Sequence, residues 1–267
     1  MFELLSVSEP LTRPGLVFFI GCIRLLVFFS LVPFLSGEAV PAQLRFSLSA
    51  LMAFFVYPVY AELSPPPGAA FYPWLICVIG KEMLVGFLLA YAASVIFWAM
   101  LSVGFIMDNQ RGAGMAQATD PASGESTSLF GGFLHQTTIY IFFSSGAFLQ
   151  VLLLLLHSYG VCPPGFELAA AAREGIPTFL LGQFSRLMAM AILFAAPIML
   201  VCLLSDVSLG IVNRISPQLN VFFLSMPIKS ALGLLMIMLY MGTLLPLINR
   251  ELFSLGGYLA PLWNVLR

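Results

Sequence analysis

Long apolar runs alternate along this chain with short polar or proline-rich breaks. A membrane-spanning helix needs about 20 apolar residues, and the runs that approach or exceed this length are 14–35, 44–61, 73–106, 129–158, 179–205 and 228–249. The breaks at 64–68 and 162–165 contain consecutive prolines, which lack the backbone donor that a continuing helix needs. The pattern predicts an all-α integral membrane protein with about six long apolar segments.

Several of these runs do not fit a simple bundle of crossing helices. As one helix, 73–106 would measure about 50 Å at 1.5 Å per residue, whereas the hydrocarbon core is about 30 Å thick. Either 73–80 is a separate interfacial piece, or the helices tilt and reach beyond the bilayer. The run 220–229 is too short to cross, which favours a re-entrant or protein-buried element. The stretch 254–267 contains two glycines and a proline and is expected to be an irregular or interfacial tail.

A polar stretch interrupts the apolar pattern near the middle of the chain. It covers residues 104–130, GFIMDNQRGAGMAQATDPASGESTSLF, and carries charges at Asp108, Arg111, Asp120 and Glu125. Its glycines and its proline argue against a continuous helix. Connections of this length in compact proteins are usually functional or disordered. We therefore expect this loop to carry the function and the apolar segments to hold it.

Composition supports a membrane location. The 267 residues are 60% hydrophobic and 9% charged, whereas soluble domains carry about 25% charged residues. The net charge of −1 does not suggest nucleic-acid binding. A cleaved signal peptide is not expected, because the first residues are acidic as well as basic. The four cysteines are isolated from one another, which indicates neither a zinc site nor a disulfide framework.

Four charged residues fall inside or at the edge of apolar segments: Arg24, Glu82, Arg186 and Asp206. Charges at such positions are costly and normally pair with one another or line a watery cavity. We favour pairing between helices or subunits over an ion pathway, because no two carboxylates share a helix face. A secondary transporter that uses Glu82, Asp206 or Arg186 in an ion-coupled site remains the alternative, although the chain shows no internal repeat.

Enzyme chemistry has little support in the sequence. His135 and His157 each stand alone, and no metal-binding, nucleophile-elbow or nucleotide-binding motif accompanies them. We therefore expect a non-enzymatic protein without a cofactor or metal.

Two further patterns concern packing. Gly86, Ala90 and Ser94 are spaced by four residues, as in seams that let helices approach closely; the seam could be internal or could face another subunit. Residues 209–233, LGIVNRISPQLNVFFLSMPIKSALG, form the most specific stretch in the chain. Two prolines there predict a broken helix whose polar groups are satisfied locally.

This last stretch resembles a known family. Asn213-Arg214, the block 217–222 (PQLNVF), Pro227, Lys229 and Gly233 resemble the signature of the export-apparatus T/R (SctT/FliR) family of type III secretion systems and the related flagellar exporter. Weaker matches occur in the same order at Glu82 and Gly86, at Gly104, Asp108, Gln110 and Gly112, and at Asp120-Pro121. The sequence of residues 108–112, DNQRG, is closer to the virulence injectisome branch than to the flagellar branch, which stays the alternative.

The resemblance implies a subunit of a protein-export gate in the bacterial inner membrane. Members of this family assemble with R-type and S-type membrane proteins into a helical ring of kinked hairpins around a pore. The U-type switch protein, the needle or rod base, membrane lipid and secreted unfolded polypeptides are the further partners it implies. The whole chain is then one export-gate domain, with a central loop at 107–128 that plugs the pore.

Carried onto this sequence, the resemblance assigns two sets of residues. The expected plug residues are Met107, Asp108, Asn109, Gln110, Arg111, Gly112, Gly114, Met115, Asp120, Pro121, Ser123, Gly124 and Glu125. The expected subunit-packing residues are Glu82, Gly86, Ala90, Arg214, Pro217, Gln218, Asn220, Pro227 and Lys229. Glycines and small polar residues suit a plug that must rearrange without gripping its cargo, and Met107 and Met115 are expected to fill a constriction as soft side chains.

Overall fold

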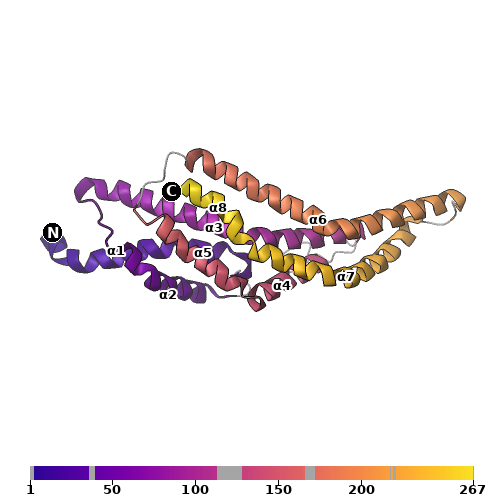
Figure 1. Cartoon of the computed structure of the whole chain (residues 1–267), viewed down its shortest axis with the longest axis horizontal. Helices are drawn as coiled ribbons and strands as arrows, with labels where there is room; N and C mark the ends of the chain where they lie inside the picture. The colour runs from indigo at the N-terminus through magenta and orange to yellow at the C-terminus, as the bar shows by residue number, and fades with distance from the viewer. Residues whose placement is uncertain are drawn as a thin grey trace. The chain divides into compact units, whose positions relative to one another are not determined.

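The computed structural model describes residues 3–35, 40–112, 128–165, 172–216, 218 and 221–266, and the regular structure within them is helical (Figure 1). The helices are α1 (Glu3–Leu31), α2 (Ala42–Tyr60), α3 (Phe71–Gln110), α4 (Leu129–Ser144), α5 (Ala147–Val161), α6 (Ala172–Ile215), α7 (Val221–Phe253) and α8 (Leu255–Leu266), with 3-10 turns at Pro33–Leu35 and Gly68–Ala70. The prediction of an all-α protein is confirmed.

Five helical segments in this part of the chain are long and apolar enough to cross a membrane, and α4 with α5 would add a sixth as one broken span. This agrees with the six apolar runs of the sequence. The protein is therefore a multi-pass membrane protein. Its helices differ in burial: in the most apolar window of α3, 72% of the residues are buried, against 17% for α2.

The long helices are continuous. α3 contains 40 residues and α6 contains 44, so they measure about 60 and 66 Å at 1.5 Å per residue. Pro73 lies in the first turn of α3, where a helix tolerates proline because no backbone acceptor is available there. A separate interfacial piece at 73–80 is therefore wrong. The alternative, that the helices tilt and reach beyond the bilayer, stays a prediction.

Three element boundaries differ from the sequence expectations. The run 129–158 breaks between α4 and α5, where Gly146 adopts a φ of +80°. Residues 221–229 of the expected separate element form the first turns of α7, which continues through Pro227, and Asn220 lies outside the described residues. Residues 255–266 of the expected irregular or interfacial tail form helix α8, in which Leu255, Leu259, Leu262 and Leu266 are buried at helical spacing. Burial of this apolar stripe outweighs the low helix propensity of the glycines and proline.

The helices gather into two compact units. Unit 1 comprises residues 1–94, 148–183 and 254–267, and unit 2 comprises 95–147 and 184–253. Helices α3 and α6 each contribute residues to both units.

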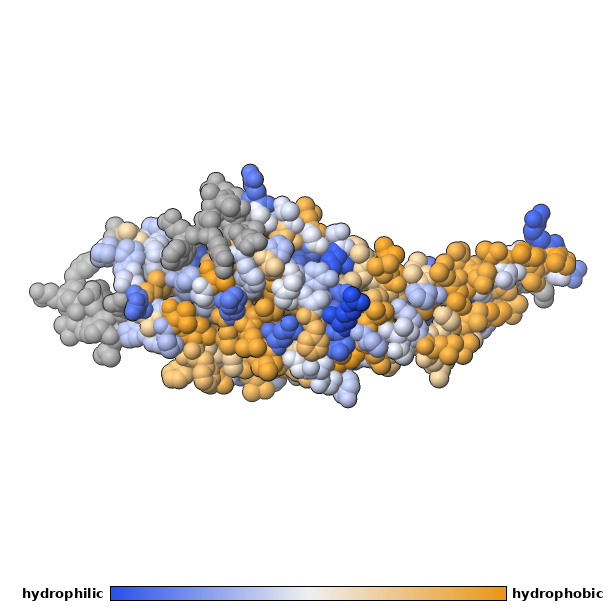
Figure 2. Space-filling view, viewed as in Figure 1, coloured by the Kyte–Doolittle hydropathy of each residue, from blue (hydrophilic) through white to orange (hydrophobic). Residues whose placement is uncertain are grey.

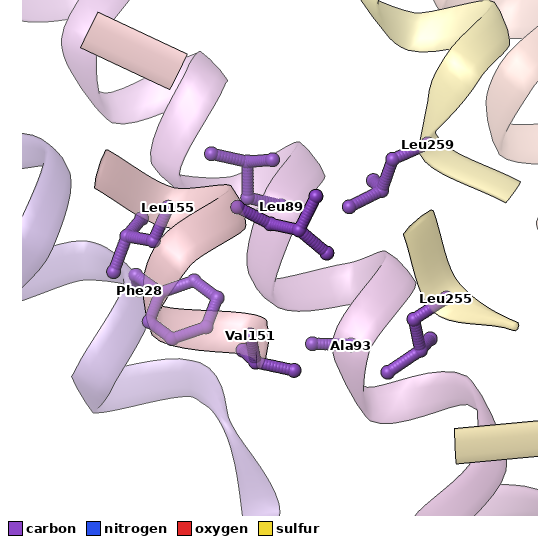
Figure 3. Close-up of a pocket in the computed structure, with 8 residues that line it drawn as sticks. Phe28, Leu89, Ala93, Val151, Leu155, Leu255 and Leu259 are labelled. Atoms are coloured by element: carbon purple, nitrogen blue, oxygen red, sulfur yellow. The ribbon is translucent and has the colours of Figure 1, made fainter. Parts of the chain in front are cut away.

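In unit 1, α1 packs along α2 and against the first half of α3. A Cβ atom on Gly86 would lie 2.6 Å from the carbonyl oxygen of Arg24, and one on Gly21 would lie 2.0 Å from the hydroxyl of Tyr60. Both glycines therefore permit a close helix contact that a larger residue would prevent. A small apolar cleft between α1, α3, α5 and α8 is lined by hydrocarbon side chains such as Phe28 and Leu259 (Figure 3).

In unit 2, the second half of α3 packs against α4, and α4 contacts α7. The rings of Phe97 and Phe142 meet edge to face with centroids 5.3 Å apart. Nearer the end of α3, a Cβ atom on Gly104 would lie 2.1 Å from the backbone nitrogen of Gly131. The two helices therefore touch backbone to backbone beside the polar connection.

Candidate functional site

Asp108 joins the two ends of the polar connection between α3 and α4. It lies in the last turn of α3 and is 1% exposed. Its Oδ2 accepts hydrogen bonds from the Ser128 hydroxyl at 2.5 Å and from the Phe130 backbone nitrogen at 3.2 Å. Both donors belong to the start of α4, so one carboxylate holds the end of α3 to the beginning of the next helix.

Arg111 balances the charge of this carboxylate. Its Nη2 and Nε lie 2.6 and 2.9 Å from Asp108 Oδ1. The guanidinium carbon also lies 4.2 Å from the ring centroid of Phe130, in the geometry of a cation–π contact. Asp108 thus has a cation and two neutral donors, which offset the cost of removing a carboxylate from water.

Ser128 has two roles at the start of α4. While its hydroxyl donates to Asp108, its oxygen accepts a hydrogen bond from the Gly131 backbone nitrogen at 2.8 Å. The second bond satisfies one of the free donors at a helix start, as N-cap serines do. We call Asp108, Arg111, Ser128 and Phe130 the loop-base clamp.

Gly112 ends α3. Its φ is +75°, which residues with a side chain rarely adopt, and its backbone nitrogen donates to the Asn109 carbonyl at 3.1 Å. This is the usual arrangement for glycine just past a helix C-terminus. A Cβ atom here would approach the Met226 side chain of α7 at 3.4 Å. The chain therefore leaves α3 at a fixed point next to α7.

The structure alters the expected start of the loop. Met107, Asp108, Asn109 and Gln110 lie within α3, because the apolar packing of that helix continues to its last turn. Met107 is 2% exposed, so its side chain is buried inside the chain; its expected part in filling a constriction stays a prediction. The remaining expected plug residues lie outside the described residues: Gly114, Met115, Asp120, Pro121, Ser123, Gly124 and Glu125.

A second polar cluster lies inside unit 1 and centres on Arg24. Its guanidinium forms two hydrogen bonds with Glu82, at 2.8 and 3.0 Å, and reaches the Ser158 hydroxyl at 2.9 Å and the Cys162 carbonyl at 2.7 Å. Arg24 and Glu82 are 0% exposed. The cluster therefore links α1 and α3 to the end of α5.

Two neighbouring side chains complete this cluster. Lys81 Nζ lies 3.3 Å from Glu82 and donates to the Pro163 carbonyl at 2.6 Å. The ring of Tyr159 stacks under the Arg24 guanidinium at 4.2 Å, and its hydroxyl donates to the Gly21 carbonyl at 2.6 Å. The Lys81 contact fastens the proline-rich turn at 162–165 to the first half of α3, and the Tyr159 contacts hold α5 to α1.

Unit 2 contains two more ion pairs, both between α6 and α7. Arg186 lies 2.9 Å from Glu251, and Lys229 lies 2.5 Å from Asp206. Together with Arg24 and Glu82, all four charges identified in apolar segments have partners within the chain. The prediction that they pair is confirmed, and the pairs are interhelical.

The expected subunit-packing residues divide by burial. Glu82, Gly86 and Ala90 are buried within the chain, and Gly86 faces α1, so the small-residue seam is internal at that position. Lys229 is partly buried by its ion pair, whereas Arg214, Gln218 and Pro227 are exposed. Pro217 and Asn220 lie outside the described residues. A role in contacts between subunits stays a prediction, and the exposed members are best placed for it.

Sequence reasoning missed the partners that complete these clusters: Ser128, Phe130, Ser158, Tyr159 and Glu251. Only Ser128 has a local signal, because a serine directly before an apolar run is a helix N-cap pattern. Among the described residues, no three or more His, Cys, Asp or Glu side chains are grouped to hold a metal.

Comparison with known proteins places these features in a family. The family model described as "Bacterial export proteins, family 1" matches residues 16–255. The chain is 37% identical over 235 residues to "Yop proteins translocation protein T" of Yersinia pestis, covering 88% of this chain and 89% of the relative. It is 33% identical over 221 residues to "Surface presentation of antigens protein SpaR" of Shigella flexneri, covering 83% of each chain.

A flagellar relative is more distant. "Flagellar biosynthetic protein FliR" of Bacillus subtilis is 27% identical over 238 residues, covering 89% of this chain and 90% of the relative. The match therefore extends along nearly the whole length of both kinds of relative, with higher identity to the two translocation and surface-presentation proteins. The chain belongs to the bacterial export proteins, family 1.

Proposed function

We propose that this protein is a non-catalytic subunit of the export gate of a type III protein secretion system, in the injectisome branch and in the bacterial inner membrane. Family membership and the names of the relatives support the export role. The lower identity to the flagellar relative supports the injectisome branch. R-type and S-type membrane proteins of the same apparatus are the proposed assembly partners, the U-type switch protein and needle or rod base are proposed neighbours, and unfolded polypeptides are the cargo.

Ion pairing in the described structure weakens the transporter alternative. An ion-coupled transporter would need a charged group that can exchange its partner for a transported ion. The three candidates are already engaged: Glu82 with Arg24, Arg186 with Glu251, and Asp206 with Lys229. These pairs fit a structural frame better than an ion-binding site.

Within the gate, we propose that residues 113–127 act as the pore plug. The observation that supports this is the loop-base clamp, in which Asp108 of α3 binds Ser128 and Phe130 of α4. Such a clamp holds the two ends of the segment at one place. Small polar residues and glycines there offer passing polypeptide little apolar surface to adhere to.

Deleting 115–123 tests the plug. The deletion retains all four clamp residues, so the complex should assemble as before while its closed pore conducts ions in planar bilayers. A matched variant should replace 115–123 with nine glycine and serine residues, which keeps the length and removes the specific side chains. Unchanged conductance of a fully assembled deletion complex would contradict the plug role without affecting the assignment to the export apparatus.

A further inference from the structure

Gly112 is the last described residue before the polar connection between α3 and α4. Its φ of +75° favours glycine, so this position has no side chain of its own to cover the backbone. The three atoms nearest to a Cβ atom placed there all belong to Met226 of α7, with Cγ at 3.4 Å, Cε at 3.9 Å and Sδ at 4.0 Å. The Met226 side chain therefore lies along the backbone of Gly112.

The burial of Met226 agrees with this contact. Its neighbours at the start of α7 are exposed, Phe223 by 70% and Leu224 by 42%, and in Figure 2 the surface over the end of α6 and the start of α7 is predominantly hydrophobic. Met226 itself is partly buried. A methionine side chain is unbranched and flexible, so it can follow an irregular surface such as the backbone at the end of a helix.

The start of α7 is itself fixed within unit 2. Three residues after Met226, Lys229 pairs with Asp206 of α6 at 2.5 Å, and α7 also contacts α4. Gly112, Met226 and Lys229 all belong to this unit. Met226 is therefore carried by a helix that has contacts on two sides, and it touches the polar connection at its first end.

This contact and the loop-base clamp hold different groups. In the clamp, Asp108 joins the last turn of α3 to the start of α4 through Ser128 and Phe130. Met226 instead contacts the backbone beyond the last helical residue of α3. Arg111 lies between the two, because its side chain belongs to the clamp and its peptide bond leads to Gly112. Loss of the Met226 side chain should free that peptide bond while the clamp remains.

We propose that Met226 is a positioning residue for the connection between α3 and α4, because its side chain holds Gly112 against α7. For its consequence in the gate, this proposal rests on the proposed plug role of residues 113–127. The place from which the plug starts is then set by the first turns of α7. The proposal also gives a task to part of residues 209–233, the stretch with the most specific sequence in the chain.

Limited trypsin digestion of the full chain in mild detergent tests the contact. Met226→Ala should speed cleavage after Arg111 by about fivefold, because a lost contact of this size shifts a local opening by about that factor and cleavage follows the open population. Met226→Leu keeps a side chain of similar volume and should restore the original rate. Met238→Ala removes a 71% exposed methionine from the same helix and is the matched control.

Cleavage after Arg186 separates positioning from a general loss of structure. The Arg186 side chain is 11% exposed and lies within α6, so cleavage there requires that the helix opens. We expect Met226→Ala to leave this rate unchanged. If the alanine variant does not fold, Met226→Val carries the same comparison with a smaller increase, because valine keeps a Cγ atom and lacks Sδ and Cε.

Conductance of the assembled complex in planar bilayers tests the consequence for the gate. The closed pore should conduct ions with Met226→Ala, as with the deletion of 115–123, and should stay sealed with Met226→Leu. If the deletion complex also stays sealed, the plug role fails, and the trypsin comparison alone decides whether Met226 holds Gly112.

Three outcomes would overturn the proposal. Equal cleavage after Arg111 in Met226→Ala and Met238→Ala would show that Met226 does not hold Gly112. A parallel rise in cleavage after Arg186 would show a general loss of stability in place of positioning. A sealed and fully assembled Met226→Ala complex beside a leaking deletion complex would show that this contact does not position the plug.

Discussion

Arg24 and Glu82 meet inside unit 1 through two hydrogen bonds, and neither side chain is exposed. Removing one partner of such a pair leaves a buried charge uncompensated, whereas replacing both by apolar residues can be nearly neutral. Glu82 also has Lys81 at 3.3 Å, so the carboxylate keeps a cation when Arg24 is removed. The two positions are therefore not equivalent.

We expect Glu82→Met to lower the free energy of unfolding by about 3–5 kcal/mol. Arg24→Met should lower it by less. The double substitution should cost less than the sum of the two single losses, because it leaves neither charge unpaired. Thermal unfolding of the purified protein in detergent measures all three. Additive losses in the double variant would contradict the view that the two residues act as a pair.

The loop-base clamp makes a second prediction. Asp108→Ala removes the acceptor for Ser128 and Phe130 and the partner of Arg111, and each buried donor left unsatisfied costs about 1–3 kcal/mol. Trypsin should then cut faster after Arg111, whose side chain is 14% exposed in the clamp. Asn109→Ala, one position further and exposed, is the matched control. Equal cleavage rates in both variants would show that the clamp does not hold this site closed.

For single residues, the sequence identified the charged members of each polar cluster but not their neutral partners. Asp108, Arg111, Arg24 and Glu82 stand out because charge is rare in so apolar a chain. Their neutral partners could not be predicted, because the position of Ser158, 134 residues from Arg24 along the chain, is set by how α1, α3 and α5 pack together. The pattern of a single sequence carries no signal for such a contact.

Among the helices, the contact between α3 and α4 depends on two glycines. A Cβ atom on Gly104 would meet the Gly131 backbone at 2.1 Å, whereas nothing lies within 4 Å of one on Gly132. Gly104→Ala should therefore separate the helices and cost about 1–3 kcal/mol, as overpacking does.

Gly132→Ala should be neutral or slightly stabilising, because alanine favours helix more than glycine. The difference in thermal midpoint between the two variants measures the effect. A Gly104→Ala protein as stable as the Gly132→Ala protein would show that α3 and α4 are not tightly apposed.

The sequence predicted helix type well and helix ends poorly. Hydropathy gave the apolar runs, but α6 (Ala172–Ile215) continues well past its run at 179–205, and most of its residues after Asp206 are exposed. Hydropathy alone does not locate the end of such a helix. Helix α8 was missed because Gly256, Gly257 and Pro261 suggest a break, while its stabilisation comes from burying four leucines. Local propensity and tertiary packing disagree there, and packing prevails.

For the whole molecule, the exposed apolar surface indicates what surrounds it. Large hydrophobic side chains such as Phe54, Phe55 and Ile76 are more than 60% exposed, and surfaces of this kind are covered by lipid or by other protein. In the proposed gate assembly, partner subunits would cover part of this surface. A protein built in this way should be most stable when its partners are present.

Native mass spectrometry of the protein co-expressed with its neighbouring genes and purified in mild detergent tests the export-gate assignment most directly. We expect a complex in which this chain is joined by several copies of two smaller membrane proteins, the R-type and S-type subunits. A lone monomer or a homodimer under these conditions would contradict the assignment and would favour a protein that works by itself.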